Sequence, residues 1–258
     1  MTNELFQLRT TKRSFSGLNN LLNSEFSRWR TKDWYIMAGI WIAVINLGIF
    51  SMTSSAETTV KEGLMMMGLF AAMFPVINVI ILLQDEIISH KESGTVSWIL
   101  SKPVSRSSFI LSKLIGNFIG VSISMALFPS ILAYIQFIVL KEVFLSPFQY
   151  LLGIVLISIY LLFYLTLTLM LGTIFKQRGG VIGIPLVLAL GYSFISSFPL
   201  VSFIHPMGMF FPTQDGLPMF GSLILGEPIG SISPLIITVV MIVIFTLVAL
   251  WKFKNEDF

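Results

Sequence analysis

Six stretches of this chain carry no charged residue and are each long enough to cross a lipid bilayer. Each stretch predicts one transmembrane helix, because a helix needs about 20 apolar residues to span the hydrocarbon core. None of them shows the period-two alternation of a transmembrane barrel strand. We therefore expect an all-α polytopic membrane protein with an N-terminal segment, 1–33, and a six-span domain, 34–258. The predicted spans are 34–52, 63–84, 114–140, 149–175, 179–198 and 234–251.

The composition excludes the main soluble classes of protein. Only 16 basic and 13 acidic residues occur among 258, while 55% are hydrophobic and the mean hydropathy is +0.88. A soluble domain of this length has too little interior to bury so much apolar surface. The composition therefore excludes an ordinary soluble enzyme and a disordered chain.

The chain also lacks the motifs of the common catalytic sites. It has no cysteine and no phosphate-binding loop, and the signatures of serine hydrolases and zinc proteases are missing. The predicted spans contain no Asp, Glu, Lys, Arg or His, although ion-coupled carriers generally place such groups there. We expect no catalytic residue and no cofactor in this chain, and an external source of energy for any uphill transport.

The basic residues predict the sidedness of the chain. Fourteen of the 16 fall on one side of the six-span arrangement, and only Lys61 and Lys141 fall on the other. Because basic residues accumulate in cytoplasmic segments, both termini are expected in the cytoplasm of a cell-membrane protein. This sidedness explains the pI near 9.2 without a nucleic-acid partner. The fourteen are Arg9, Lys12, Arg13, Arg28, Arg30, Lys32, Lys91, Lys102, Arg106, Lys113, Lys176, Arg178, Lys252 and Lys254.

Residues 18–33 have the pattern of an amphipathic helix lying at the membrane interface. Apolar residues recur at helical spacing, and polar residues fall on the opposite face. Such a helix could be an elbow that transmits movement or a simple anchor, and the pattern slightly favours the anchor. The apolar set is Leu18, Leu22, Phe26 and Trp29, and the polar set is Asn19, Asn23, Ser27 and Arg30.

The stretch 85–113 between the second and third spans predicts a short amphipathic helix on the cytoplasmic side. Gly94 and Thr95 interrupt the chain after an acidic start, and apolar residues then follow at helical spacing. Lys102 ends any helix, because the residue before Pro103 avoids the α region. The segment either rests on lipid headgroups or docks onto a cytoplasmic partner.

This stretch resembles the connection between spans two and three in the membrane subunits of type-two ABC exporters. The resemblance rests on Gly94-Thr95, Trp98-Ile99-Leu100-Ser101, Pro103-Val104-Ser105-Arg106 and Lys113. It implies a coupling helix seated in a groove of a separate ATPase subunit, which would hold the ATP and Mg. His90 stands where the family often has an acid, and Glu86 and Glu92 lie nearby. The implied coupling residues are Glu92, Gly94, Thr95, Trp98, Leu100, Pro103 and Arg106.

The outer loop 199–233 is rich in Pro and Gly but remains strongly apolar, so we do not expect it to stand free in water. We expect short re-entrant helices packed on the spans, as the resemblance also implies. Within the loop, His205, Met207 and Met209 suit Cu(I), but packing is the favoured interpretation.

Two pairs of small residues permit close approach of helices: Gly116 with Gly120, and Gly179 with Gly183. The resemblance makes span five, which contains Gly179 and Gly183, a candidate for the dimer interface. A second permease copy is expected, in a homodimer or a heterodimer. The predicted function is the membrane subunit of an ATP-driven ABC exporter. A non-transporting scaffold or assembly subunit is the alternative, and a channel or secondary carrier is disfavoured by the uncharged spans.

Overall fold

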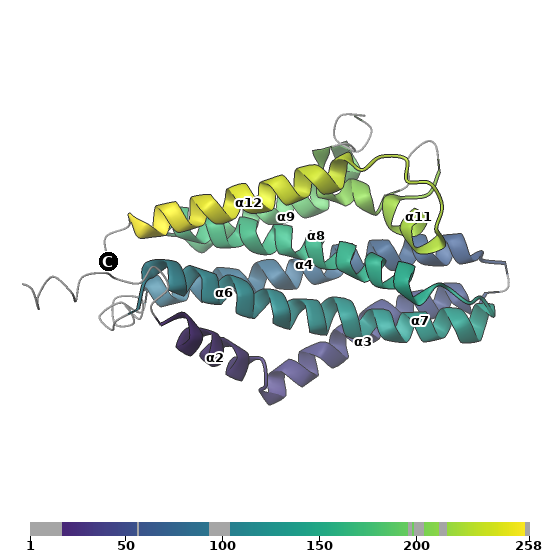
Figure 1. The fold of residues 1–258 in the computed structure, drawn as a ribbon, viewed down its shortest axis with the longest axis horizontal. Coiled ribbons are helices and arrows are strands. Elements are labelled where there is room, and N and C mark those ends of the chain that lie inside the picture. Colours follow the sequence, from purple (N-terminus) through teal and green to yellow (C-terminus); the bar gives the residue numbers. More distant parts are fainter. Residues whose placement is uncertain are drawn as a thin grey trace, which may run out of the picture.

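The computed structural model describes residues 17–55, 57–92, 104–195, 198, 204–211 and 216–255. These parts are helical and contain no β-strand. Long helices run side by side along the length of the molecule (Figure 1). The helix α2, Leu18–Arg28, lies at one end, where α6 begins and α12 ends, and α11, Met219–Leu225, lies near the other. We call these the α2 end and the α11 end.

Five helices in the described parts are long and apolar enough to cross a membrane, which confirms a multi-pass membrane protein. The helix α9, Arg178–Ile195, corresponds to the fifth predicted span and has a shorter apolar stretch, Arg178–Tyr192. The count of six spans therefore stays a prediction. The five are α3 (Lys32–Thr53), α4 (Val60–Glu92), the rod Arg106–Lys141, α8 (Pro147–Ile174) and α12 (Ser233–Lys254).

The rod Arg106–Lys141 changes its helical form at its centre. It consists of α6, Arg106–Val121, a π-helical turn, Ser122–Leu127, and α7, Phe128–Lys141. Pro129 is the second residue after the π turn and has no N–H to donate to the preceding turn. A wider turn accommodates such a missing hydrogen bond without ending the helix. The rod also starts eight residues before the predicted span at 114, which places Lys113 inside the helix.

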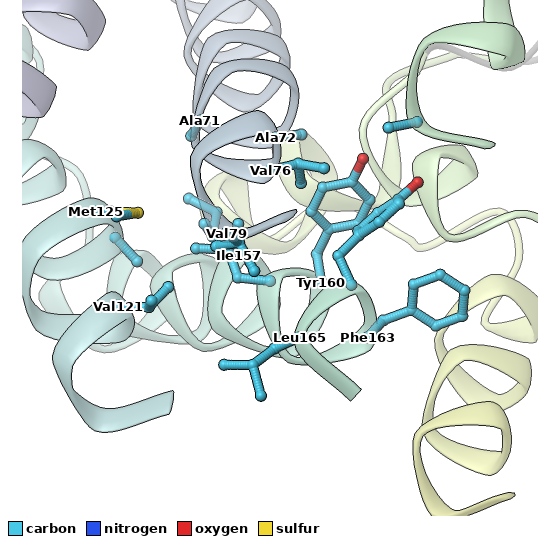
Figure 2. Packing of buried hydrophobic residues seen from close by; sticks show 14 of the residues in the cluster. Ala71, Ala72, Val76, Val79, Val121, Met125, Ile157, Tyr160, Phe163 and Leu165 are labelled. Carbon is cyan, nitrogen blue, oxygen red and sulfur yellow. The ribbon is translucent and has the colours of Figure 1, made fainter. Parts of the chain in front are cut away.

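The core is centred on α8. Its side chains Ile157 and Tyr160 are fully buried and point toward those of α4 (Figure 2), and Leu165 on another side of α8 is fully buried as well. In contrast, α12 exposes most of its apolar surface, including Val243 and Leu247. The bundle is therefore enclosed around α8 and apolar on its outside, as a protein surrounded by lipid requires.

The outer loop forms short helices that pack on the bundle. They are α11 and the 3-10 helix η2, Pro206–Met209. Phe210 and Phe220 are fully buried beside each other, with ring centroids 5.6 Å apart. A Cβ added at Gly68 of α4 would lie 2.8 Å from the Phe220 ring, so this glycine permits the contact. The depth at which these helices enter the bilayer stays a prediction.

Candidate functional site

The helix α2 packs directly on α6 at the α2 end of the molecule (Figure 1). The pair Gly116 and Gly120 makes this contact possible. A Cβ at Gly116 would lie 2.6 Å from the Cβ of Glu25, and one at Gly120 would lie 2.1 Å from the Trp29 ring. This pair of small residues therefore serves a contact within the chain.

Glu25 is buried in this contact although it is acidic. It follows Leu18 and Leu22 at helical spacing and precedes Trp29 by one turn, so it lies on the apolar face of α2. The polar residues predicted for the opposite face are exposed, which agrees with the amphipathic pattern. These are Asn19, Asn23, Ser27 and Arg30.

Four charged side chains meet where α2, α4 and α6 come together, and we call Glu25, Arg28, Glu86 and Lys113 the charge cluster. The Nζ of Lys113 lies 2.7 Å from Oε1 of Glu25 and 2.5 Å from Oε2 of Glu86. The guanidinium of Arg28 pairs with the Glu86 carboxylate, and its Nη2 lies 3.1 Å from Oε2 of Glu25. Each base therefore bridges both acids.

Asn117 completes the network one turn beyond Lys113. Its Oδ1 accepts a hydrogen bond from Nη2 of Arg28 at 2.7 Å, and its Nδ2 donates to the Lys113 carbonyl at 2.7 Å. The Asn117 side chain is fully buried. It thus fixes the guanidinium of α2 against the backbone of α6.

The cluster is electrically neutral and mostly removed from solvent. The side chains of Lys113, Glu25 and Glu86 are only 8%, 9% and 11% exposed. Burial lowers the pKa of Arg28, and the neighbouring Glu25 carboxylate opposes that shift. Because arginine stays protonated in proteins, Arg28 supplies a lasting positive charge between the two acids. Such a group holds its helices in one register, because separating the charges would leave some of them buried and unpaired.

The end of α12 also joins the start of α6. Nη1 of Arg106 donates to the Lys254 carbonyl at 2.8 Å, and the rings of Phe109 and Phe253 stack with centroids 5.3 Å apart. The first turns of α6 therefore contact α2, α4 and α12 together.

Most residues implied in ATPase coupling lie outside the described residues: Gly94, Thr95, Trp98, Leu100 and Pro103. Two of that set lie on the flanking helices, since Glu92 ends α4 and Arg106 begins α6. The charge cluster joins these same two helices. The role of the seven implied residues in ATPase coupling stays a prediction.

The remaining sequence candidates lie on α9 and near η2. A Cβ at Gly179 or Gly183 would have no atom of the described residues within 4 Å, so this part of the chain leaves both positions open. His205 caps η2: its Nδ1 accepts from the Met207 N–H at 3.1 Å, and its Nε2 lies 3.1 Å from the Leu188 carbonyl. The sulfur of Met207 accepts from the Tyr160 hydroxyl at 3.1 Å, and Met209 is fully buried.

Sequence reasoning missed the charge cluster as a site. From the sequence, Arg28 is a marker of sidedness, Lys113 is a marker of sidedness and part of the family resemblance, and Glu86 is an acid near His90. One signal was available, because Glu25 is an acid in the middle of an apolar helix face, and such a residue requires a buried partner. The sequence did not show which helix supplies that partner.

The described residues contain no group of three His, Asp or Glu side chains that could hold a metal ion. No curated protein matches the chain significantly. The family model of the ABC-2 family transporter proteins matches residues 21–251, which includes most of α2 and nearly all of the helical bundle. A match over most of the chain, to a family of multi-pass transporter subunits, agrees with the membrane-spanning helices described above. The chain therefore belongs to the ABC-2 transporter family and is a membrane permease subunit of an ABC transporter.

Proposed function

We propose that this permease is the membrane half of an ATP-driven exporter and that residues 92–106 dock onto its separate ATPase subunit. In this proposal the charge cluster passes the movement of the docking segment to α2, α4 and α6 together. The observation that carries it is the position of the cluster. Glu86 and Lys113 lie on the two helices that flank the docking segment, and they are joined by a 2.5 Å ion pair.

Within the docking segment, Trp98 and Leu100 are the expected anchors. Amphipathic helices insert apolar side chains into a partner's groove, and such anchors contribute about 2 kcal/mol or more each. Gly94 would permit close approach of the backbone, and Arg106 would lie at the rim. A scaffold subunit that couples to no ATPase has no need of these anchors.

Co-purification of the ATPase tests the docking. The permease is expressed together with a candidate ABC ATPase subunit from the same genome, and the retained ATPase is quantified. We expect the double variant Trp98→Ala/Leu100→Ala to lose the ATPase while it still inserts into the membrane, because both residues lie outside the predicted spans. The matched control is Leu247→Ala/Trp251→Ala, which removes one Leu and one Trp that are 60% and 66% exposed on α12.

The control variant should retain the ATPase as the unmodified chain does. Retention by the Trp98→Ala/Leu100→Ala variant as well would contradict docking through this segment and favour the scaffold alternative.

The sidedness of the permease can be tested by cysteine labelling, because the natural chain has no cysteine. We propose that the α2 end faces the cytoplasm, as the excess of basic residues there predicts. An impermeant maleimide added to intact cells should label Ser54→Cys, at the far end of α3, but not Asn255→Cys, just after α12. The reverse pattern would contradict the proposed topology.

We infer that two permease copies assemble, because two ATPases require two docking segments. The copies are identical or similar, and the start of α9 contributes to their interface at Gly179. Oxidation of Gly179→Cys should then give a disulfide-linked dimer, whereas Gly39→Cys, equally open but on α3, should not. Equal cross-linking at both positions would contradict an interface at α9.

A further inference from the structure

A cleft of about 740 Å³ lies between α8, α9 and α12. It is lined by Phe163 and Leu167 of α8, by one face of α9 from Gly183 to Gly191, and by one face of α12 from Ile237 to Phe245. Ile204 and His205, just ahead of η2, and Pro206, its first residue, complete the lining. The volume is typical of a site for a small molecule.

The polar side chains in the lining are already satisfied. Thr238 donates through its hydroxyl to the Pro234 carbonyl at 2.6 Å. His205 uses Nε2 toward the Leu188 carbonyl and Nδ1 toward the Met207 N–H. The other lining residues are apolar or glycine. A ligand of this cleft therefore gains nothing from polar or charged groups.

Filling such a cleft with water is unfavourable, and leaving it empty is unfavourable as well. A buried water needs two to four polar partners, and these walls offer none that are free. An empty space of this size forfeits the contacts of every side chain around it. Apolar cavities accordingly take up apolar guests.

The cleft is continuous with the surface that faces the bilayer. Ile184 and Val187 line the cleft and are also 46% and 72% exposed, and the neighbouring face of α12 is exposed at Val240 and Ile244. Because the chain spans the membrane, lipid tails lie against these faces. The guest that reaches the cleft from this surface is an acyl chain.

The length of the cleft fits one leaflet. Gly183 and Gly191 are just over two turns apart on α9, about 12 Å along its axis. This is less than half of the roughly 30 Å hydrocarbon thickness. Residues 204–206 place the cleft toward the α11 end of the bundle.

We propose that the cleft is a binding site for an acyl chain of a membrane lipid, taken from the leaflet on the α11 side. The proposal rests on the membrane location of the chain and is independent of ATPase docking. The two glycines keep the cleft open, because a Cβ at Gly183 or Gly191 would meet no atom within 4 Å. A larger side chain at these positions would occupy the space of the lipid tail.

Photocross-linking of the full chain tests the site. The permease is placed in phosphatidylcholine nanodiscs that contain a trace of phosphatidylcholine with a diazirine in mid-chain, and adducts are mapped by mass spectrometry after irradiation. We expect adducts on lining residues such as Ile237 and Met241, at a yield severalfold lower in Gly183→Leu/Gly191→Leu. The matched control is Gly39→Leu, which adds the same side chain in open space on α3 and should leave the yield unchanged.

Two outcomes would overturn the proposal. In the first, adducts at Ile237 and Met241 would be as abundant in the double variant as in the unmodified chain. In the second, Val187→Cys would form a disulfide-linked dimer, which would mean that a second copy and not a lipid covers the cleft. If the double leucine variant does not fold, Gly183→Ala/Gly191→Ala provides a milder filling and should still lower the yield.

Discussion

The two ends of the molecule are held together by different interactions. At the α2 end, four charged side chains are shared by α2, α4 and α6, and three of them are nearly buried. At the α11 end, the buried contacts are aromatic, as in the Phe210–Phe220 pair. The ion pair there, Lys61 with Glu227 at 2.7 Å, is exposed.

The difference separates two mechanical roles. An aromatic cluster packs well in several slightly shifted arrangements, whereas buried charges tolerate no arrangement that leaves one unpaired. The α2 end is therefore expected to move as a unit, and the α11 end to close the bundle by packing. Four predictions test this contrast, in order of decreasing effect.

Removing the central charge of the cluster should have the largest effect. Lys113→Met leaves Glu25 and Glu86 with Arg28 alone, and breaking a buried ion network from one side costs about 3–5 kcal/mol. The free energy of unfolding, measured by denaturant titration of the purified permease in detergent, should fall by that amount. A loss below about 1 kcal/mol, typical of an exposed pair, would show that the cluster is not a buried network.

Acidification should weaken the α11 end through His205. Burial lowers the pKa of His205 to about 4 from its ordinary value of 6.5. The unfolded chain therefore binds a proton at higher pH than the folded chain, and stability is lost as the pH falls from 6.5 to 4. The loss approaches about 3 kcal/mol at the lower limit.

The variant His205→Asn isolates this contribution, because asparagine can still cap η2 but does not titrate. We expect the melting temperature of the unmodified protein to fall more steeply between pH 6.5 and 4.5 than that of the variant. Parallel curves would contradict the assignment of a neutral, buried His205.

The glycines at the two ends should differ in their tolerance of a methyl group. Gly120→Ala places a Cβ 2.1 Å from the Trp29 ring, whereas Gly68→Ala places one 2.8 Å from the Phe220 ring. Overpacking generally costs about 1–3 kcal/mol, and the closer contact should lie at the upper limit. The melting temperature of Gly120→Ala should be lower than that of Gly68→Ala. The opposite order would mean that α2 shifts to accommodate the added methyl group more easily than α11 does.

The smallest effect is expected for the exposed pair at the α11 end. The side chains of Lys61 and Glu227 are 55% and 39% exposed, and such pairs contribute about 0–1 kcal/mol. Lys61→Met should therefore change the free energy of unfolding by less than about 1 kcal/mol. Lys61→Met and Lys113→Met each remove one lysine charge. If both lowered the free energy of unfolding by a similar amount, the two ends would not differ in how their charges contribute to stability.

The fold could be predicted largely from the sequence because hydropathy reports directly which segments tolerate lipid. The five long helices coincide with predicted spans, and the amphipathic face of α2 is as expected. The fifth predicted span is not among these five, because the described apolar stretch of α9 is short.

The partners of the charged residues could not be predicted in the same way. The hydropathy pattern places Lys113 just before a span, because hydropathy treats each residue alone and does not include its pairing with Glu25 and Glu86. The contact of α2 with α6 was equally hidden, since the pair Gly116 and Gly120 is too common to indicate a partner. Pairing between distant helices depends on packing, which local sequence patterns do not encode.

The central claim is that the charge cluster makes α2 and α6 move together when the ATPase binds nucleotide. Spin labels on Asn23→Cys in α2 and Ser107→Cys in α6 report the distance between these helices by double electron–electron resonance. In the permease–ATPase complex, with labelled permease diluted into an excess of unlabelled permease so that only distances within one copy are recorded, we expect one narrow distance distribution that is the same without nucleotide and with ATP and vanadate. Adding Lys113→Met should broaden the distribution or make it nucleotide-dependent. A distance that changes with nucleotide in the unmodified cluster, or that Lys113→Met leaves unaffected, would contradict the account.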